Sequence, residues 1–205
     1  LYLELATDLA DENDFSAGAQ NCSEFDNGAY TGEISAEMLS EIGIEFCIVG
    51  HSERRKYFSE TNETIARKIA QLLKYQIIPV VCCGETLDER NAGKHFDVVE
   101  KQIKECLFGL SNKEFESVVI AYEPVWAIGT GVTATPAQAQ EMHQFIREQI
   151  AHQYGNLANN VAILYGGSVK PDNAQTIFSQ PDVDGGLVGG AALNTADFTA
   201  IINAI

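Results

Sequence analysis

Short apolar runs alternate with amphipathic stretches along the whole chain, and this alternation limits the possible folds more than any other feature of the sequence. Each apolar run is bounded by glycine or polar residues, and most runs are rich in Val, Ile or Cys. Parallel strands that are covered on both faces have this composition. The predicted strands are Phe15–Gln20, Glu45–Val49, Ile77–Cys83, Ser117–Tyr122, Val161–Tyr165 and Val183–Val188.

Amphipathic helices are predicted between these strands. Thr64–Tyr75 and Phe96–Leu107 repeat apolar residues at helical spacing. A further helix is expected to begin at Thr135, an N-cap residue that is followed by Pro136 and, three positions after the cap, by Gln138. Other helices are expected from Pro171, over Ala196–Ile205 and, at the start of the chain, over Leu1–Ala10.

Strand–helix alternation of this density predicts β-α-β units and a parallel sheet. No linker rich in Pro, Ser or charged residues divides the chain, so we expect a single domain over residues 1–205. A (β/α)8 barrel takes about 250 residues, and the difference of roughly 45 residues corresponds to two strands and one helix. An open doubly wound sheet fits the alternation as well, so the pattern by itself leaves both architectures open.

The composition excludes several classes of protein. An apolar fraction of 45% and a charged fraction of 20% are those of a globular chain, not of a disordered one. No apolar run approaches the roughly 18 residues that cross a bilayer, and the formal net charge of −16 argues against nucleic-acid binding. The five cysteines are odd in number and have no CxxC spacing, so we expect reduced thiols in a cytoplasmic protein and no metal site.

His51 follows the strand that ends at Val49, at a point where a helix is expected to begin. In parallel α/β folds, the reacting groups lie at the carboxyl ends of strands. A helix N-terminus disfavours a protonated imidazole, so we expect His51 to be neutral and to donate a hydrogen bond. Taken alone, His51 could also be a packed histidine beside a solvated cluster of Glu53 and arginines.

Glu123 comes directly after the strand that ends at Tyr122. A carboxylate in this place can abstract a proton from carbon if it is shielded from water. The segment that follows is apolar, begins with Pro124 and ends in Gly-Thr-Gly, a composition that suits a rigid lid between two hinges. Alternatively, it is an ordinary loop whose Trp126 covers the core.

Two pairs of glycines follow later strands, at Gly166–Gly167 before Ser168 and at Gly189–Gly190. Paired glycines let backbone N–H groups approach an anion, and in barrels the loops after the last two strands often form the phosphate site. Alternatively, the glycines serve tight turns only. The polar loop that contains Gly28–Gly32 shows no chemistry of its own.

Together and in this order, these segments resemble the triosephosphate isomerase family. The resemblance extends over essentially all 205 residues, and the run at 122–131 is highly specific to that family. The matching segments are AQN at 19–21, GAYTGEIS at 28–35, VGHSERR at 49–55, CCGETL at 82–87, AYEPVWAIGTG at 121–131, YGGSV at 165–169 and LVGGAAL at 187–193.

The resemblance implies a (β/α)8 barrel that interconverts dihydroxyacetone phosphate and D-glyceraldehyde 3-phosphate in glycolysis and gluconeogenesis, without a cofactor or metal. Carried over by position, Glu123 would be the base that moves the proton between two carbons. His51 would be the neutral electrophile at the substrate oxygens, with Glu53 as a supporting carboxylate. The substrate phosphate would be held by Gly129 on the lid, Ser168, Gly189 and Gly190.

The resemblance also implies a cytoplasmic homodimer that binds neither nucleic acid nor membrane. The loop Gly28–Ser35 would reach into the second subunit with Tyr30, Thr31 and Gly32, and Thr31 would lie near the partner's site.

One departure from the family concerns the N-terminal part. The family's first strand carries an Asn-x-Lys motif whose Lys stabilises charge on the substrate, and the 205 residues contain no such motif. The sequence begins with Leu1 and its first methionine is Met38, so we expect a piece that lacks roughly the first 45 residues of a barrel: the first strand, first helix and second strand.

We expect such a piece to be unstable and nearly inactive alone, because it lacks the cation that faces the oxyanion and exposes two strand edges. The alternative from another class is a non-catalytic barrel remnant that acts as an assembly or interaction module. The sequence keeps His51, Glu123 and the lid segment, which argues against a non-catalytic remnant. An aldolase would need a Lys for a Schiff base at a strand end, and the predicted strands offer none.

Overall fold

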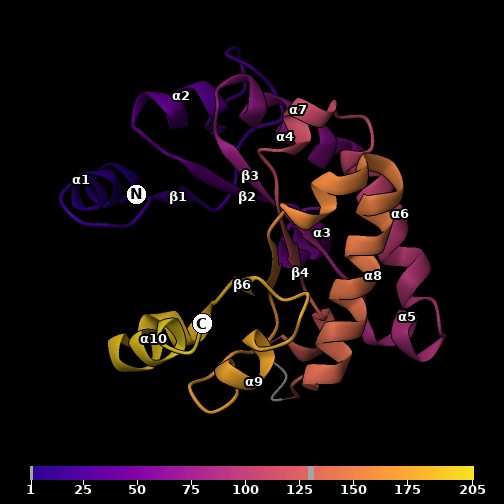
Figure 1. Ribbon diagram of the computed structural model, residues 1–205. Coiled ribbons are helices and arrows are strands. Elements are labelled where there is room, and N and C mark those ends of the chain that lie inside the picture. Colours follow the sequence, from indigo (N-terminus) through magenta and orange to yellow (C-terminus); the bar gives the residue numbers. More distant parts are fainter. Residues whose placement is uncertain (1, 129–131) are drawn as a thin grey trace. The chain divides into compact units, whose positions relative to one another are not determined.

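Helices alternate with six short strands in the computed structural model, which describes residues 2–128 and 132–205 (Figure 1). Every strand lies inside a run that the sequence predicts as a strand, but each is shorter than predicted. The α/β class is therefore confirmed. The strands are β1 (Gly18–Ala19), β2 (Phe46–Val49), β3 (Ile78–Cys83), β4 (Val119–Tyr122), β5 (Ile163–Tyr165) and β6 (Gly185–Gly186).

The chain forms two compact units. The first unit runs to Cys82 and includes Glu105–Val118, and the second consists of Cys83–Lys104 and Val119–Ile205. In the first unit, β1 pairs with β2 and β2 pairs with β3. In the second unit, β4 pairs with β5 and β5 pairs with β6. All four pairings are parallel, as β-α-β units require. A closed barrel and a single domain stay predictions.

In the first unit, α4 covers β2 with the apolar stripe that the sequence predicts. Ile65, Ile69 and Leu72 on this helix are completely buried, and burying each stabilises the unit by roughly 1.5–3 kcal/mol. Thr61 begins the helix, because its side chain accepts a hydrogen bond from the Thr64 N–H. The helices of this unit are α1 (Leu3–Asp11), α2 (Ala36–Glu41), α3 (Ser52–Tyr57), α4 (Asn62–Lys74) and α7 (Asn112–Phe115).

In the second unit, the long helix α8 packs against β5 and α9. It begins as the sequence predicts: Thr135 and Gln138 form a reciprocal capping box around Pro136. It ends at Gly155, whose φ of +59° favours glycine. The helices are α5 (Leu87–Asn91), α6 (His95–Leu107, mostly in this unit), α8 (Pro136–Tyr154), α9 (Ala174–Phe178) and α10 (Thr195–Ile202). Short 3-10 segments are η1 (Val125–Ala127), η2 (Gly155–Asn159) and η3 (Gly190–Leu193).

The prediction that Pro171 begins a helix is wrong. Residues 171–173 form a turn, and α9 begins only at Ala174. The side chain of Asn173 closes this turn, because it accepts a hydrogen bond from the Lys170 N–H at 2.8 Å and donates to the Ser168 carbonyl at 3.2 Å. These local side-chain bonds hold the turn that precedes α9.

All five cysteines are buried. Burial raises the pKa of Cys106 to about 11, so this thiol stays protonated at neutral pH. None of the helices in the described part of the chain is long and apolar enough to cross a membrane.

Candidate active site

The predicted site residues divide between the two units. His51, in the first unit, comes two residues after β2 and is the N-cap of α3, so the predicted helix start is confirmed. Its Nδ1 accepts a hydrogen bond from the Glu53 N–H at 3.4 Å. Only a neutral imidazole can accept a hydrogen bond at Nδ1, so this contact is compatible with the predicted neutral ring, which stays a prediction. The Glu53 carboxylate lies 3.8 Å from the same Nδ1.

The chain around His51 is held by Gly50 and Arg55. Gly50 has a φ of +73°, and a Cβ there would lie 3.2 Å from the Cys82 carbonyl oxygen, so only glycine fits well. The Arg55 guanidinium donates to the Gly50 carbonyl at 2.8 Å and to the Cys82 carbonyl at 3.1 Å. One arginine therefore ties the end of β2 to the end of β3.

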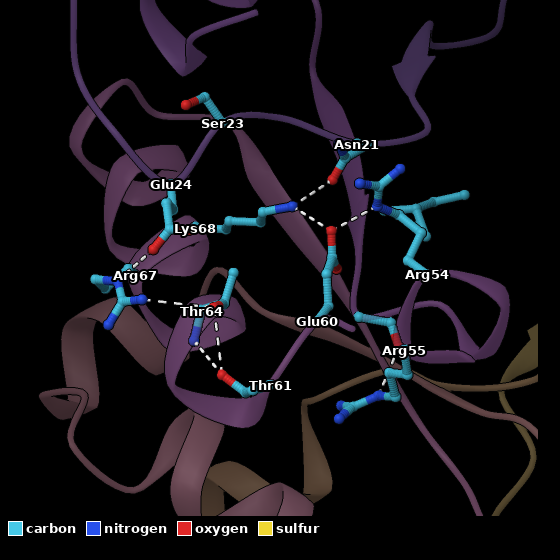
Figure 2. A network of polar contacts seen from close by, with 12 residues as sticks. Asn21, Ser23, Glu24, Arg54, Arg55, Glu60, Thr61, Thr64, Arg67 and Lys68 are labelled. Carbon is cyan, nitrogen blue, oxygen red and sulfur yellow. Dashed lines mark hydrogen bonds and ion pairs between the residues drawn. The ribbon is translucent and has the colours of Figure 1, made fainter. Parts of the chain in front are cut away.

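A buried ionic network links α3, α4 and the segment after β1, as Figure 2 shows. Lys68 on α4 donates to Asn21 Oδ1 at 2.7 Å and to Glu60 Oε1 at 2.5 Å, and Arg54 Nε donates to the same carboxylate oxygen at 2.5 Å. The side chains of Glu60 and Lys68 are each 5% exposed. Burial alone raises the pKa of Glu60, but the hydrogen bonds from Lys68 and Arg54 outweigh it and the pKa is lowered. The carboxylate is thus ionised at neutral pH.

Sequence reasoning missed this network, although one signal was available. Lys68 stands within the apolar stripe of α4, between Ile65 and Ile69, where a lone charge must find a buried partner.

The predicted dimer loop, also in the first unit, is exposed at Tyr30, Thr31 and Gly32 and closed at its neck. The Ser23 N–H donates to the Ile34 carbonyl at 2.8 Å across the neck. Within the loop, the Phe25 and Tyr30 rings stack with centroids 4.3 Å apart. The loop thus has a defined shape with an exposed tip.

Two acidic residues just before this loop, Glu24 and Asp26, brace it through contacts with α4 and its C-cap residue Tyr75. Glu24 accepts a hydrogen bond from Arg67 at 2.5 Å, which Figure 2 also shows. Asp26 pairs with Lys74 and accepts a hydrogen bond from the Tyr75 hydroxyl at 2.8 Å. These partners lower the pKa of Asp26.

Glu123, in the second unit, directly follows β4 and is 1% exposed. Its N–H donates to the Cys83 carbonyl at 2.7 Å. Gly166 makes room for the side chain, because a Cβ there would lie 3.0 Å from Glu123 Cγ. The carboxylate therefore has the shielding from water that proton abstraction from carbon requires.

Glu85 is a buried residue that sequence reasoning missed. It is completely buried and accepts hydrogen bonds from Trp126 Nε1 at 2.8 Å, from Arg90 at 3.0 Å and from the Tyr122 hydroxyl at 3.1 Å. Its carbonyl also accepts the Val125 N–H at 3.1 Å. These bonds anchor the start of the predicted lid. The signal in the sequence that could have identified Glu85 is a carboxylate two residues after a predicted strand.

The predicted phosphate residues also lie in the second unit. The Ser168 hydroxyl donates to the Ala127 carbonyl at 2.9 Å, which brings it to the start of the predicted lid. Gly189 is the N-cap of η3, and both Gly189 and Gly190 are exposed with open space where a Cβ would stand. Gly129 lies outside the described residues. Among the described residues, no three His, Cys, Asp or Glu side chains converge as a metal site would need.

Comparison with known proteins agrees with these local features. The family model "Triosephosphate isomerase" matches residues 1–205. The triosephosphate isomerase of Flavobacterium johnsoniae is 55% identical over 188 residues, which cover 91% of this chain and 75% of that protein. That of Bacteroides fragilis is 51% identical over 205 residues, covering 100% of this chain and 81% of that protein. That of Cytophaga hutchinsonii is 53% identical over 202 residues, covering 98% and 80%.

Proposed function

The chain belongs to the triosephosphate isomerase family, and on that premise we propose that it interconverts dihydroxyacetone phosphate and D-glyceraldehyde 3-phosphate, a reaction of glycolysis and gluconeogenesis. The observation that carries the proposal is Glu123: a carboxylate directly after a parallel strand, 1% exposed, with its main chain fixed by a 2.7 Å hydrogen bond. Such a group suits proton transfer at carbon.

The proposed reaction needs a base and an electrophile. Glu123 takes a proton from the carbon beside the substrate carbonyl, the electron pair of that C–H bond forms a C=C bond, and the carbonyl π pair moves to its oxygen, which gives an enediolate. The Nε2–H of His51 stabilises the two oxygens, between which one proton passes from the former hydroxyl to the former carbonyl oxygen, and Glu123 returns its proton to the former carbonyl carbon. Triosephosphate isomerases are the established example of a glutamate base with a neutral histidine, and these roles follow that example.

The remaining predicted residues have supporting roles in this proposal. Glu53 lies beside the His51 ring. Ser168, Gly189, Gly190 and Gly129 hold the substrate phosphate through hydroxyl and backbone N–H groups. Trp126, fixed by Glu85, forms the anchored end of a lid that excludes water.

We further propose that the protein is a cytoplasmic homodimer that associates through Gly28–Ser35, with Tyr30, Thr31 and Gly32 at the contact. The exposed tip and braced base of that loop support this proposal. Because the loop is already ordered, docking costs little conformational entropy.

The test is an isomerisation assay with the purified chain and its Glu123→Gln variant. Glutamine keeps the size of the side chain but cannot accept the proton, so kcat should fall by about 10²–10⁴-fold. Glu148→Gln, which removes an exposed carboxylate on α8, should leave kcat unchanged. Equal activity in the wild type and Glu123→Gln would point to a contaminating isomerase and contradict the proposal.

The same assay decides between this proposal and the opposing expectation from the sequence, that the chain is nearly inactive alone. If the wild-type chain and all variants are inactive, catalysis by these residues is contradicted and the non-catalytic alternative is favoured.

A further inference from the structure

We propose that Gln102 is a positioning residue that holds Glu123 in its working place by clamping Gly84. The inference rests on the proposed function, because it concerns the residue proposed there as the base. It adds a residue far from Glu123 in sequence to the machinery of that site.

Gln102 makes an unusual pair of contacts with one residue. Its Oε1 accepts a hydrogen bond from the Gly84 N–H at 2.8 Å, and its Nε2 donates to the Gly84 carbonyl at 3.0 Å. A single carboxamide thus binds both polar groups of Gly84, one residue after β3 ends. Gln102 also lies beside the buried stripe of α6, between Val99 and Ile103, where an apolar residue is expected.

Gly84 in turn sets the main chain of Glu123. A Cβ built on Gly84 would lie 1.8 Å from the Glu123 carbonyl oxygen and 2.7 Å from its carbonyl carbon, so the two backbones are in direct contact. The neighbours of Gly84 bind the same segment: the Cys83 carbonyl accepts the Glu123 N–H at 2.7 Å, and the Glu85 carbonyl accepts the Val125 N–H at 3.1 Å. A shift of residue 84 therefore shifts residue 123.

The chemistry of the clamp explains why an amide stands here. An apolar side chain of similar length would fill the same space but would leave the Gly84 N–H and carbonyl without their partner. The Gln102 side chain thus fixes the position of Gly84 in addition to filling space beside it. Because a misplacement of about 1 Å can cost about 10²-fold in rate, its loss should lower kcat more than it weakens substrate binding.

The experiment compares the wild-type chain with Gln102→Met and Gln102→Glu. For Gln102→Met we expect kcat to fall by about 10- to 100-fold, with KM changed by less than about 3-fold. The matched control is Gln144→Met, which removes an exposed amide on α8 that donates to Glu148 at 3.0 Å, and it should leave kcat unchanged. Amide hydrogen exchange at Gly84 and Glu123 should be faster in Gln102→Met and unchanged in Gln144→Met.

The Gln102→Glu variant provides a second measurement, the pH dependence of kcat. This dependence would not change if Gln102 had only a structural role. The new carboxylate accepts from the Gly84 N–H but repels the Gly84 carbonyl, whereas its protonated form can donate to that carbonyl. The ratio of its kcat to the wild-type kcat should therefore rise as the pH is lowered from about 8 to about 5. This variant also serves as the test if Gln102→Met does not fold.

The outcomes separate this inference from the proposed function. A kcat within twofold of wild type in Gln102→Met, while Glu123→Gln is inactive, would overturn the inference and leave the proposed function intact. Wild-type activity in Glu123→Gln would overturn both. If the chain has no measurable activity, the proposed function is contradicted, and unchanged exchange at Gly84 and Glu123 in Gln102→Met would overturn the inference independently.

Discussion

The two units hold their proposed functional residues by different means. In the first, His51 is a partly exposed helix cap, and the residues around it are tied by charges: Arg54, Glu60 and Lys68. In the second, Glu123 is buried, and close contact between backbones fixes its main chain. In the first unit, the cluster of Arg54, Glu60 and Lys68 should therefore be sensitive to the loss of charge, and in the second unit Gly84 should be sensitive to the addition of volume.

The largest effect is expected for Gly84→Ala in the second unit. The new methyl would lie 1.8 Å from a carbonyl oxygen of the backbone, which cannot move aside as a side chain can. We expect destabilisation by more than about 4 kcal/mol, the range of exceptional substitutions, and loss of isomerisation. Urea unfolding followed by circular dichroism measures this. Gly109→Ala is the matched control, because nothing lies within 4 Å of a Cβ built there. Equal stability of the two variants would contradict the claim that the backbone contact at Gly84 excludes a side chain.

Removing a buried charge should have the next largest effect, in the first unit. Lys68→Met leaves the Glu60 carboxylate buried without one of its two cationic partners, which typically costs about 3–5 kcal/mol. Adding Glu60→Gln should recover part of this loss, because the uncompensated charge is then gone. Lys104→Met, which removes an exposed partner of Glu100, should change little. Strictly additive effects in the double variant would show that the two residues are not coupled.

Acid should weaken the second unit first. His143 on α8 is completely buried, and its Nδ1 lies 3.1 Å from the Asp182 carbonyl oxygen. Burial lowers the pKa of His143 to about 4, from an ordinary 6.5. The unfolded chain then binds the proton more readily than the folded one, so stability is lost as the pH falls from 6.5 towards 4, by up to about 3 kcal/mol.

Urea midpoints measured between these pH values test this prediction. His143→Asn should flatten the dependence, whereas His152→Asn, at an exposed position, should keep it. The remaining charged groups near His143 are Asp182, Asp184 and Arg147. An unchanged slope in His143→Asn would assign the acid sensitivity to another group.

The first unit should lose stability to acid at a lower pH than the second unit. The pKa of Glu60 is lowered from 4.5, so its contribution is present above that pH and is lost only as the pH falls through the lowered value. Glu60→Gln should reduce the pH dependence below 4.5 and leave the window of His143 untouched. Hydrogen exchange of first-unit amides at low pH measures this. If Glu60→Gln changed the hydrogen exchange of second-unit amides instead, the two units would not respond to acid separately.

The smallest effect is expected at the braced loop. Lys74→Gln removes an exposed partner of Asp26, so hydrogen exchange at the Ser23 amide and the dissociation constant of the proposed dimer should each rise by about 2- to 5-fold at low salt. The difference should vanish near 1 M salt, where screening acts within about 3 Å. Lys104→Gln is the matched control, since its lysine is similarly exposed. An effect that persists at high salt would contradict an ionic brace.

The sequence predicted features that depend on neighbours along the chain. The capping box at Thr135, the helix start at His51 and the apolar stripe of α4 are confirmed, because local spacing determines them. The helix expected from Pro171 begins only at Ala174, after a turn that the Asn173 side chain holds through bonds to the main chain of Ser168 and Lys170.

The features that sequence reasoning missed depend on partners far apart in the chain. Gln102 clamps a residue 18 positions away, Trp126 binds Glu85 over 41 positions, and Lys68 meets Asn21 over 47. A polar residue inside an apolar stripe shows that a partner exists but does not identify it. Folding supplies that information, since only the packed helices and strands bring the pairs together.

The central claim is that Glu123 moves a proton between two substrate carbons, and the most direct test runs the reaction in D2O. A proton held by a carboxylate can exchange with solvent, whereas a direct hydride shift between the carbons cannot exchange. We predict that NMR will show deuterium on the carbon that receives the proton with the wild-type chain, and none above background with Glu123→Gln. Deuterium uptake by Glu123→Gln at the wild-type rate, or wild-type turnover without any deuterium in the product, would contradict the account.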